Sequence, residues 1–229
     1  MAAGMRGVLG AALELAVPVE CGGCRRPGTP WCPRCAAAVR DDPVVLRPRV
    51  EIGVPAWATG RYRGPLRTAV VDLKEHRRAD LVPVLGAVLA RSLLRLAEWE
   101  AIVPAARLAL VPAPTRVLSA RRRGGDPVTA LARDAAARLG PRVAAVPLLT
   151  IAPWTRDSAG LSAGGRLANL HGAVRLVRRP PPALKAPHPG TVVLLVDDVL
   201  TTGATAASAV TALEASGVAV SGVVVLAGA

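Results

Sequence analysis

The chain has 229 residues, of which 52% are hydrophobic and 20% are charged, so it can bury a substantial core and is not mainly disordered. Its 29 lysines and arginines outnumber 16 acidic residues, and this net charge of +13 favours phosphate, pyrophosphate or nucleic acid as partner, although an arginine-rich coding bias explains the same excess. Only 2% of the residues are aromatic, which argues against single-strand binding by base stacking on aromatic rings.

The N-terminal segment has Arg6 ahead of an apolar stretch at residues 8–17, which is the layout of a signal peptide. Glu14 lies inside that stretch and no small-residue cleavage site follows, so an amphipathic helix is the favoured interpretation. The longest apolar run, residues 81–90, is interrupted by a proline and a glycine and is too short for a membrane span. We therefore expect a cytoplasmic protein without a membrane span.

The four cysteines form two Cys-x-x-Cys pairs, Cys21 with Cys24 and Cys32 with Cys35. Two such pairs can place four thiolates around one tetrahedral ion, which predicts a structural Zn²⁺ site with no open position for catalysis. The alternatives are two disulfides, which suit a cytosolic chain poorly, or a redox Cys-x-x-Cys, which needs only one pair. We expect residues 1–45 to form an N-terminal helix and this zinc knuckle, followed by a second domain over residues 46–229.

The rest of the chain alternates between helical and continuous apolar patterns, which predicts an α/β fold with a buried, mostly parallel sheet flanked by helices. Strands are expected near residues 50–57, 108–111, 143–151, 173–177, 192–196 and 218–226. Helices are expected from residues 63–65, over 79–98, from residue 126, near 166–169 and over 203–216.

The most informative segment is the apolar strand at 192–196, which leads into Asp197 and Asp198 and then into a Thr-Thr-Gly-Ala-Thr turn. We expect the carboxylates at the carboxyl edge of the sheet, where ligands of α/β proteins bind. The turn offers N–H groups and hydroxyls at a helix N-terminus, which suits a phosphate. The pattern predicts a phosphorylated pentose, with hydroxyls on the two aspartates and the 5-phosphate on Thr201, Thr202, Gly203, Ala204 and Thr205.

A simpler explanation of the same segment remains open. One aspartate can cap the helix while the other is solvated, and Thr-Thr-Gly is common in turns. The complete order of strand, acid pair, turn and helix is more specific than any of its parts. It resembles the 5-phosphoribosyl 1-diphosphate (PRPP) motif of the type I phosphoribosyltransferases.

Nearly the whole chain resembles the ComF family of competence-associated, phosphoribosyltransferase-like proteins. The likeness is carried by the four-cysteine knuckle, by Tyr62-Arg-Gly-x-Leu-Arg leading to Lys74, and by Val111-Pro-Ala-Pro ahead of an arginine cluster. Two loops depart from the family pattern, since Gly125-Asp126 stands where the family has Phe-Asn-Gln and Ser158 stands where it has Gln.

The resemblance implies a type I phosphoribosyltransferase-like fold with Mg²⁺ and PRPP as ligands. It implies that Thr115 and Arg116, helped by the arginines at 121–123, face the pyrophosphate, and that Arg156 closes on it from a covering loop at 154–165. A solvated basic loop and an ordinary surface loop are the alternatives for these segments. Lys74 follows an apolar helix face, and we expect its ammonium to reach solvent rather than to bind.

Two functions follow from these observations. The first is a phosphoribosyltransferase, which moves a phosphoribosyl group from PRPP to an unknown acceptor and releases pyrophosphate. The second is a non-catalytic accessory protein of competence, DNA uptake or recombination, which uses the fold to sense PRPP or to bind single-stranded DNA or a protein partner. The altered loops and the positive charge keep the second open. The fold often pairs, so a homodimer is compatible with either.

Overall fold

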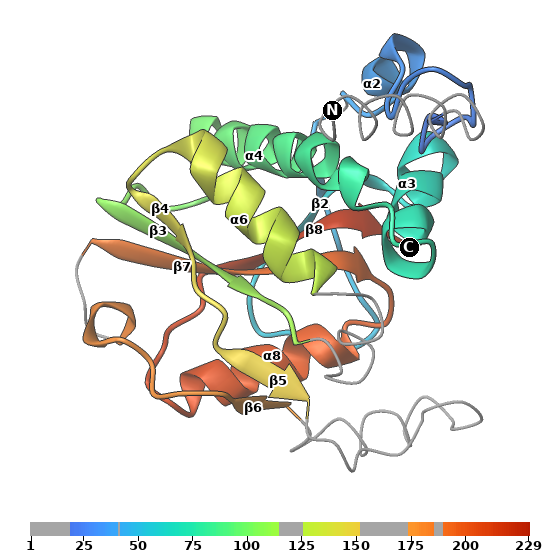
Figure 1. Cartoon of the computed structure of the whole chain (residues 1–229). Coiled ribbons are helices and arrows are strands. Elements are labelled where there is room, and N and C mark those ends of the chain that lie inside the picture. The colour runs from blue at the N-terminus through green and yellow to red at the C-terminus, as the bar shows by residue number, and fades with distance from the viewer. Residues whose placement is uncertain (1–18, 41, 115–125, 152–173, 186–189) are drawn as a thin grey trace, which may run out of the picture.

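A computed structural model describes residues 19–40, 42–114, 126–151, 174–185 and 190–229, and its centre is a six-stranded sheet (Figure 1). Five of the strands are parallel to their neighbours, and the short edge strand β1 is antiparallel to β2. The strands, in order across the sheet, are β1 (Val44–Val45), β2 (Ala56–Arg61), β8 (Gly222–Gly228), β7 (Thr191–Leu200), β3 (Arg107–Pro112) and β4 (Val143–Ala145). The prediction of an α/β fold with a mostly parallel sheet is therefore confirmed.

Helices and a small hairpin cover the two faces of this sheet (Figure 1). One face carries α3 (Gly64–Glu75), α4 (Val82–Glu98), which follows the 3₁₀ turn η1 (Ala79–Leu81), and α6 (Pro127–Leu139). The other face carries α8 (Ala204–Glu214) and the antiparallel pair β5 (Leu149–Ile151) and β6 (Val174–Leu176). Two shorter helices complete the described elements, α2 (Pro33–Ala38) and η2 (Pro182–Leu184).

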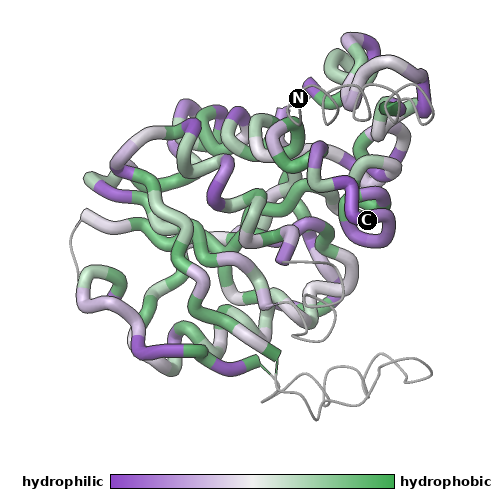
Figure 2. Tube along the Cα trace, in the orientation of Figure 1, coloured by the Kyte–Doolittle hydropathy of each residue, from purple (hydrophilic) through white to green (hydrophobic). Residues whose placement is uncertain are grey.

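The central strands are apolar on both sides because helices cover both faces of the sheet. Residues 192–196 of β7 and 223–227 of β8 are all at most 7% exposed, and the hydrophobic colour of Figure 2 follows these strands. Their side chains divide between two apolar clusters, one under α3, α4 and α6 and the other under α8. Among the helices of the described ranges, none combines the length and apolar character needed to cross a bilayer.

Three strands differ from the prediction, and one of them, expected at 218–226, begins only at Gly222 as β8. The strand expected at 50–57 begins only at Ala56, and residues 46–55 form a loop, since Pro48, Gly53 and Pro55 interrupt the run. The single strand expected at 143–151 is two short strands in different sheets, because Pro147 lies between β4 and β5. A periodicity of apolar residues does not report such breaks.

Candidate functional site

The two aspartates of the predicted site lie near the end of β7. Val196 pairs with Pro112, the last residue of β3, so Asp197 and Asp198 extend beyond the end of that neighbouring strand. On the other side Asp197 pairs with Val225, within β8. The acid pair therefore lies towards the carboxyl ends of parallel strands, the edge at which α/β proteins bind ligands.

Asp198 is buried and already has two partners on one oxygen. The residue is 5% exposed, and its Oδ1 accepts a hydrogen bond from the Val199 N–H at 2.7 Å. The ammonium of Lys74, in the last turn of α3, lies 2.8 Å from the same oxygen. The Lys74 side chain is 34% exposed and reaches solvent as expected, and its ammonium also serves as the counter-ion that a buried carboxylate requires.

Asp197 is partly exposed and is hydrogen-bonded to its neighbour. Its Oδ1 accepts a hydrogen bond from the Asp198 N–H at 2.8 Å. Burial, and then the negative charge of Asp198, raise the pKa of Asp197 well above its usual range, against the opposing effects of that N–H and of Lys74. Asp198 thus has a counter-ion, and Asp197 beside it offers a second carboxyl group that can form a hydrogen bond with a hydroxyl.

The turn after β7 leads directly into α8, as predicted. Thr202 Oγ1 accepts from the Ala204 N–H at 3.4 Å, which orients its hydroxyl towards the start of the helix. Gly203 has φ of +88°, a conformation that glycine adopts without strain. A side chain there would also lie 2.8 Å from Pro48 Cβ and 2.9 Å from the carbonyl oxygen of Val50, so only glycine fits.

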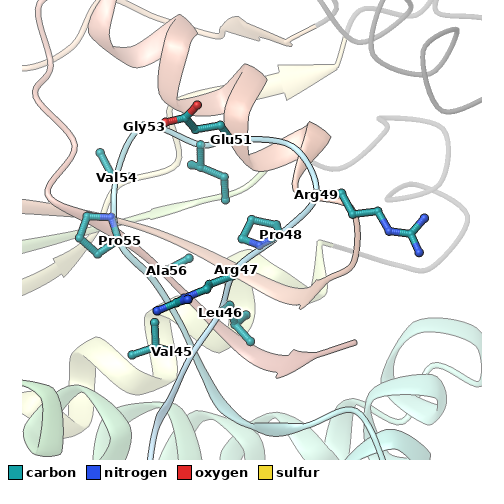
Figure 3. A pocket seen from close by; sticks show the side chains of 11 residues that line it. Val45, Leu46, Arg47, Pro48, Arg49, Glu51, Gly53, Val54, Pro55 and Ala56 are labelled. Atoms are coloured by element: carbon teal, nitrogen blue, oxygen red, sulfur yellow. The ribbon is translucent and has the colours of Figure 1, made fainter.

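The loop at residues 46–55, where a strand had been predicted, forms the wall of the site beside this turn. The loop at residues 46–55 packs on the turn, and the Val50 N–H donates to the Thr202 carbonyl at 2.9 Å. This loop lines a pocket of about 470 Å³ that carries two exposed arginines, Arg47 and Arg49, and the side chain of Arg49 points away from the inside of the loop (Figure 3). Sequence reasoning missed this wall, although an Arg-Pro-Arg string in a proline-rich stretch marks it.

The four cysteines form a second cluster, away from the acid pair in the sequence. Their four Sγ atoms all lie within 4.8 Å of one another, and Cys24 Sγ lies 3.6 Å from Cys32 Sγ. Cys21, Cys32 and Cys35 are buried, and Cys24 is exposed. The predicted gathering of the two Cys-x-x-Cys pairs is confirmed, and the cluster can hold a metal ion such as zinc.

The protonation of these thiols suits a set of metal ligands. Burial, which raises the pKa of Cys21, is outweighed by N–H groups of Cys32, Cys24 and Gly23, and the pKa falls to about 6. The Cys35 N–H likewise lowers the pKa of Cys32, whereas burial raises that of Cys35. Because thiolates are the metal ligands, binding of a cation here would release the remaining thiol protons.

Close backbone approach fastens the cysteine cluster to the rest of the protein. A side chain at Gly23 would lie 2.7 Å from Cys35 Sγ and 2.9 Å from Pro65 Cβ at the start of α3. One at Gly22 would lie 2.6 Å from Leu81 in η1. Both glycines of the first Cys-x-x-Cys pair are therefore needed for packing.

Three of the predicted ligand residues, Thr115, Arg116 and Arg156, lie outside the described residues. The same holds for the arginines at 121–123 and the expected covering loop at 154–165. The described part of the site consists of the acid pair with Lys74, the turn at 201–205 and the loop at 46–55.

No protein-family model matches this sequence, and a search of curated proteins found no significant match. The resemblance stated above accordingly depends on the residues and motifs that carry it.

Proposed function

We propose that this protein is a phosphoribosyltransferase-like protein that binds PRPP at the end of β7 and transfers its phosphoribosyl group to an acceptor. The observation that carries the proposal is the order of parts along nine residues: an acid pair at the end of a buried parallel strand, then a glycine turn, then a helix. An anion at the turn and hydroxyls at the acid pair together describe a sugar phosphate.

Each part of the site has one task in this proposal. The N–H groups and hydroxyls from Thr201 to Thr205 bind the 5-phosphate at the N-terminus of α8. The carboxylates beside it orient the ribose through its hydroxyls. Mg²⁺ bound with the substrate would offset the charge of the diphosphate.

The reaction breaks the bond between C1 of the ribose and the pyrophosphate oxygen, and the pyrophosphate leaves with the electron pair. The acceptor then forms a bond to C1 with its own electron pair. Positive charge develops on the ring in between, and the carboxyl groups that hold the ribose hydroxyls keep the ring oriented while it does. Ala204 and the following residues of α8 up to Ala209 supply no aromatic ring for stacking, so a nucleobase acceptor is disfavoured.

The proposal also covers the protein family and the metal of the cysteine cluster. We propose a type I phosphoribosyltransferase-like fold, membership of the ComF family, and structural zinc in the cysteine cluster, supported by the motifs and by the four gathered sulfurs. Four free thiols suit a reducing compartment, which supports the cytoplasm as the location.

Calorimetric titration with PRPP and Mg²⁺ tests the proposal. The wild type should bind PRPP, and the double variant Asp197→Ala/Asp198→Ala should lose at least tenfold in affinity. Asp42→Ala is the matched control, since Asp42 is an exposed acid that pairs only peripherally with Arg95. Absence of binding by a folded wild type would overturn the proposal. Binding without pyrophosphate release in the presence of cell metabolites would instead favour a PRPP-sensing accessory protein.

A further inference from the structure

We infer that the two aspartates have different tasks: Asp197 contacts the ligand, and Asp198 is a positioning residue whose charge is held by Lys74 from α3. This inference rests on the proposed function, and it deepens it by separating the two acids and by adding a residue of α3 to the site. It comes from the contacts of the three side chains.

Exposure separates the two acids first. Asp198 is 5% exposed, and its Oδ1 accepts from both the Lys74 ammonium and the Val199 N–H, at 2.8 and 2.7 Å. Burial of Asp198 limits the access of a sugar hydroxyl to its carboxylate. Asp197 is partly exposed, and its Oδ1 accepts a hydrogen bond from the Asp198 N–H. Its second oxygen is therefore the better acceptor for a ligand.

The counter-ion is what allows two acids to stand side by side. Adjacent carboxylates repel each other, and burial penalises the charge on both. Lys74 compensates Asp198 from a side chain that is itself 34% exposed, so it is less costly to desolvate than a buried lysine. Without it, a buried charge would be left uncompensated, which is costly.

The contact also orients Asp197. The Asp198 N–H that Asp197 accepts belongs to the same residue whose side chain Lys74 holds. Fixing the Asp198 side chain by Lys74 on one face and by Val199 N–H along the strand fixes this peptide group. Lys74 therefore acts on the ligand through Asp198 and Asp197, and not by touching it.

The Lys74 ammonium also affects where a divalent cation that accompanies PRPP can bind. A positive group already lies on Asp198 Oδ1, so a divalent cation cannot occupy that oxygen without displacing Lys74. We therefore expect Asp198 Oδ1 not to ligate the cation.

The first experiment needs no PRPP. The sequence has only two lysines, so trace acetylation followed by mass spectrometry compares Lys74 directly with Lys185. Lys185 follows η2, whose Leu184 lines a pocket with Thr191 at the opposite end of β7, and it serves as the internal reference. Asp198→Asn should raise the acetylation rate of Lys74 several-fold, and Asp197→Asn should change it little. Equal rates for Lys74 in the wild type and in Asp198→Asn would overturn the inference.

The second experiment measures PRPP affinity in matched lysine variants. Lys74→Met should weaken binding by about tenfold or more, Lys74→Arg should restore most of the loss because it keeps the charge, and Lys185→Met should bind like the wild type. In a double-mutant cycle, Lys74→Met should add little to the loss caused by Asp198→Asn. Full additivity, or no rescue by arginine, would overturn the positioning role. If the wild type binds no PRPP, the proposed function fails, and the acetylation rates still decide whether Lys74 holds Asp198.

Discussion

Arg25 and Asp72 lie 47 residues apart in the sequence, yet the Arg25 guanidinium donates to both carboxylate oxygens of Asp72, at 2.6 and 2.7 Å. Asp72 is fully buried in α3, and Arg25 follows directly after Cys24 with φ of +64°. The cysteine cluster is therefore clamped to α3 two residues before Lys74, the residue that reaches the acid pair. His76 Nδ1, 3.1 Å from Asp72, and Arg78, 3.9 Å away, complete the surroundings of this carboxylate.

The clamp should contribute measurably to stability. Arg25→Ala removes two charge-assisted hydrogen bonds to a buried carboxylate, and we expect it to lower the free energy of unfolding by about 1.5–3 kcal/mol. Urea denaturation measures the change. The neighbouring Arg26→Ala is the control, because Arg26 is exposed and its described contact is made by its backbone carbonyl, which accepts from the Cys21 N–H. Equal effects of the two variants would contradict the clamp.

Metal removal should unfold the cysteine cluster first. Protein purified without chelator should contain about one equivalent of zinc by elemental analysis, because four thiol ligands complete a tetrahedral site. Chelation should lower the melting temperature by several degrees, since metal binding is linked to folding. Cys35→Ser, which alters a buried ligand, should lose the metal. A metal content well under one equivalent would contradict the prediction. An absence of reactive thiols after denaturation with chelator would also contradict it, and would indicate disulfides.

Two glycines allow a matched test of the turn. Gly203 and Gly217 have nearly the same φ, +88° and +84°, but a Cβ at Gly203 would meet Pro48 and Val50, whereas one at Gly217 meets nothing within 4 Å. Gly217→Ala should therefore cost only the conformational penalty, about 1–2 kcal/mol. Gly203→Ala should cost more, because the loop at 46–55 must shift, and it should also weaken PRPP binding. Equal losses of stability in Gly203→Ala and Gly217→Ala would contradict this, because they would show that the loop at 46–55 shifts without a cost in free energy.

Because the pKa of Asp197 is raised, we expect Asp197→Asn to increase the stability of the fold by an amount that depends on pH. The folded protein holds the Asp197 proton more tightly than the unfolded chain, whose aspartates titrate near about 3.9, so this group lowers stability as pH rises above that value. Asparagine removes the penalty and can still accept from the Asp198 N–H. We expect the variant to melt a few degrees higher than the wild type at pH 7, with the difference vanishing below about pH 4. Asp198→Asn, which loses Lys74, should not melt higher, and a constant difference at all pH values would contradict this explanation.

Removing a buried hydroxyl in α4 should raise the free energy of unfolding, whereas most substitutions in a protein core lower it. Ser92 is 1% exposed, and its Oγ has no hydrogen-bond partner among the described residues. Ser92→Ala removes the unsatisfied group and introduces the best helix former, so we expect a gain of about 1 kcal/mol. Thr59 is the contrasting case, since its buried hydroxyl donates to the Leu226 carbonyl at 2.7 Å. Thr59→Val should lose about 1 kcal/mol, and a loss on Ser92→Ala would reveal a missing partner.

The parts of the molecule that depend on local pattern could be predicted from the sequence alone. Continuous apolar runs mark strands covered on both faces, so they indicate a parallel sheet wherever helices alternate with them. The gathering of the cysteines follows from their spacing within fifteen residues, and the turn at Gly203 follows from glycine's access to positive φ. Each of these is decided by neighbours along the chain.

The partners of the acid pair were decided by the tertiary structure. Lys74 precedes Asp198 by more than a hundred residues, and an apolar helix face with a lysine at its end is compatible with solvent or with a buried acid. The segment at 46–55 was likewise predicted to contain the start of a strand, but it is a loop. Its Pro48 and the backbone of Val50 pack against the turn at Thr202 and Gly203. Such choices depend on which surfaces meet when the sheet and helices pack, since a charge is buried only where packing provides an opposite one.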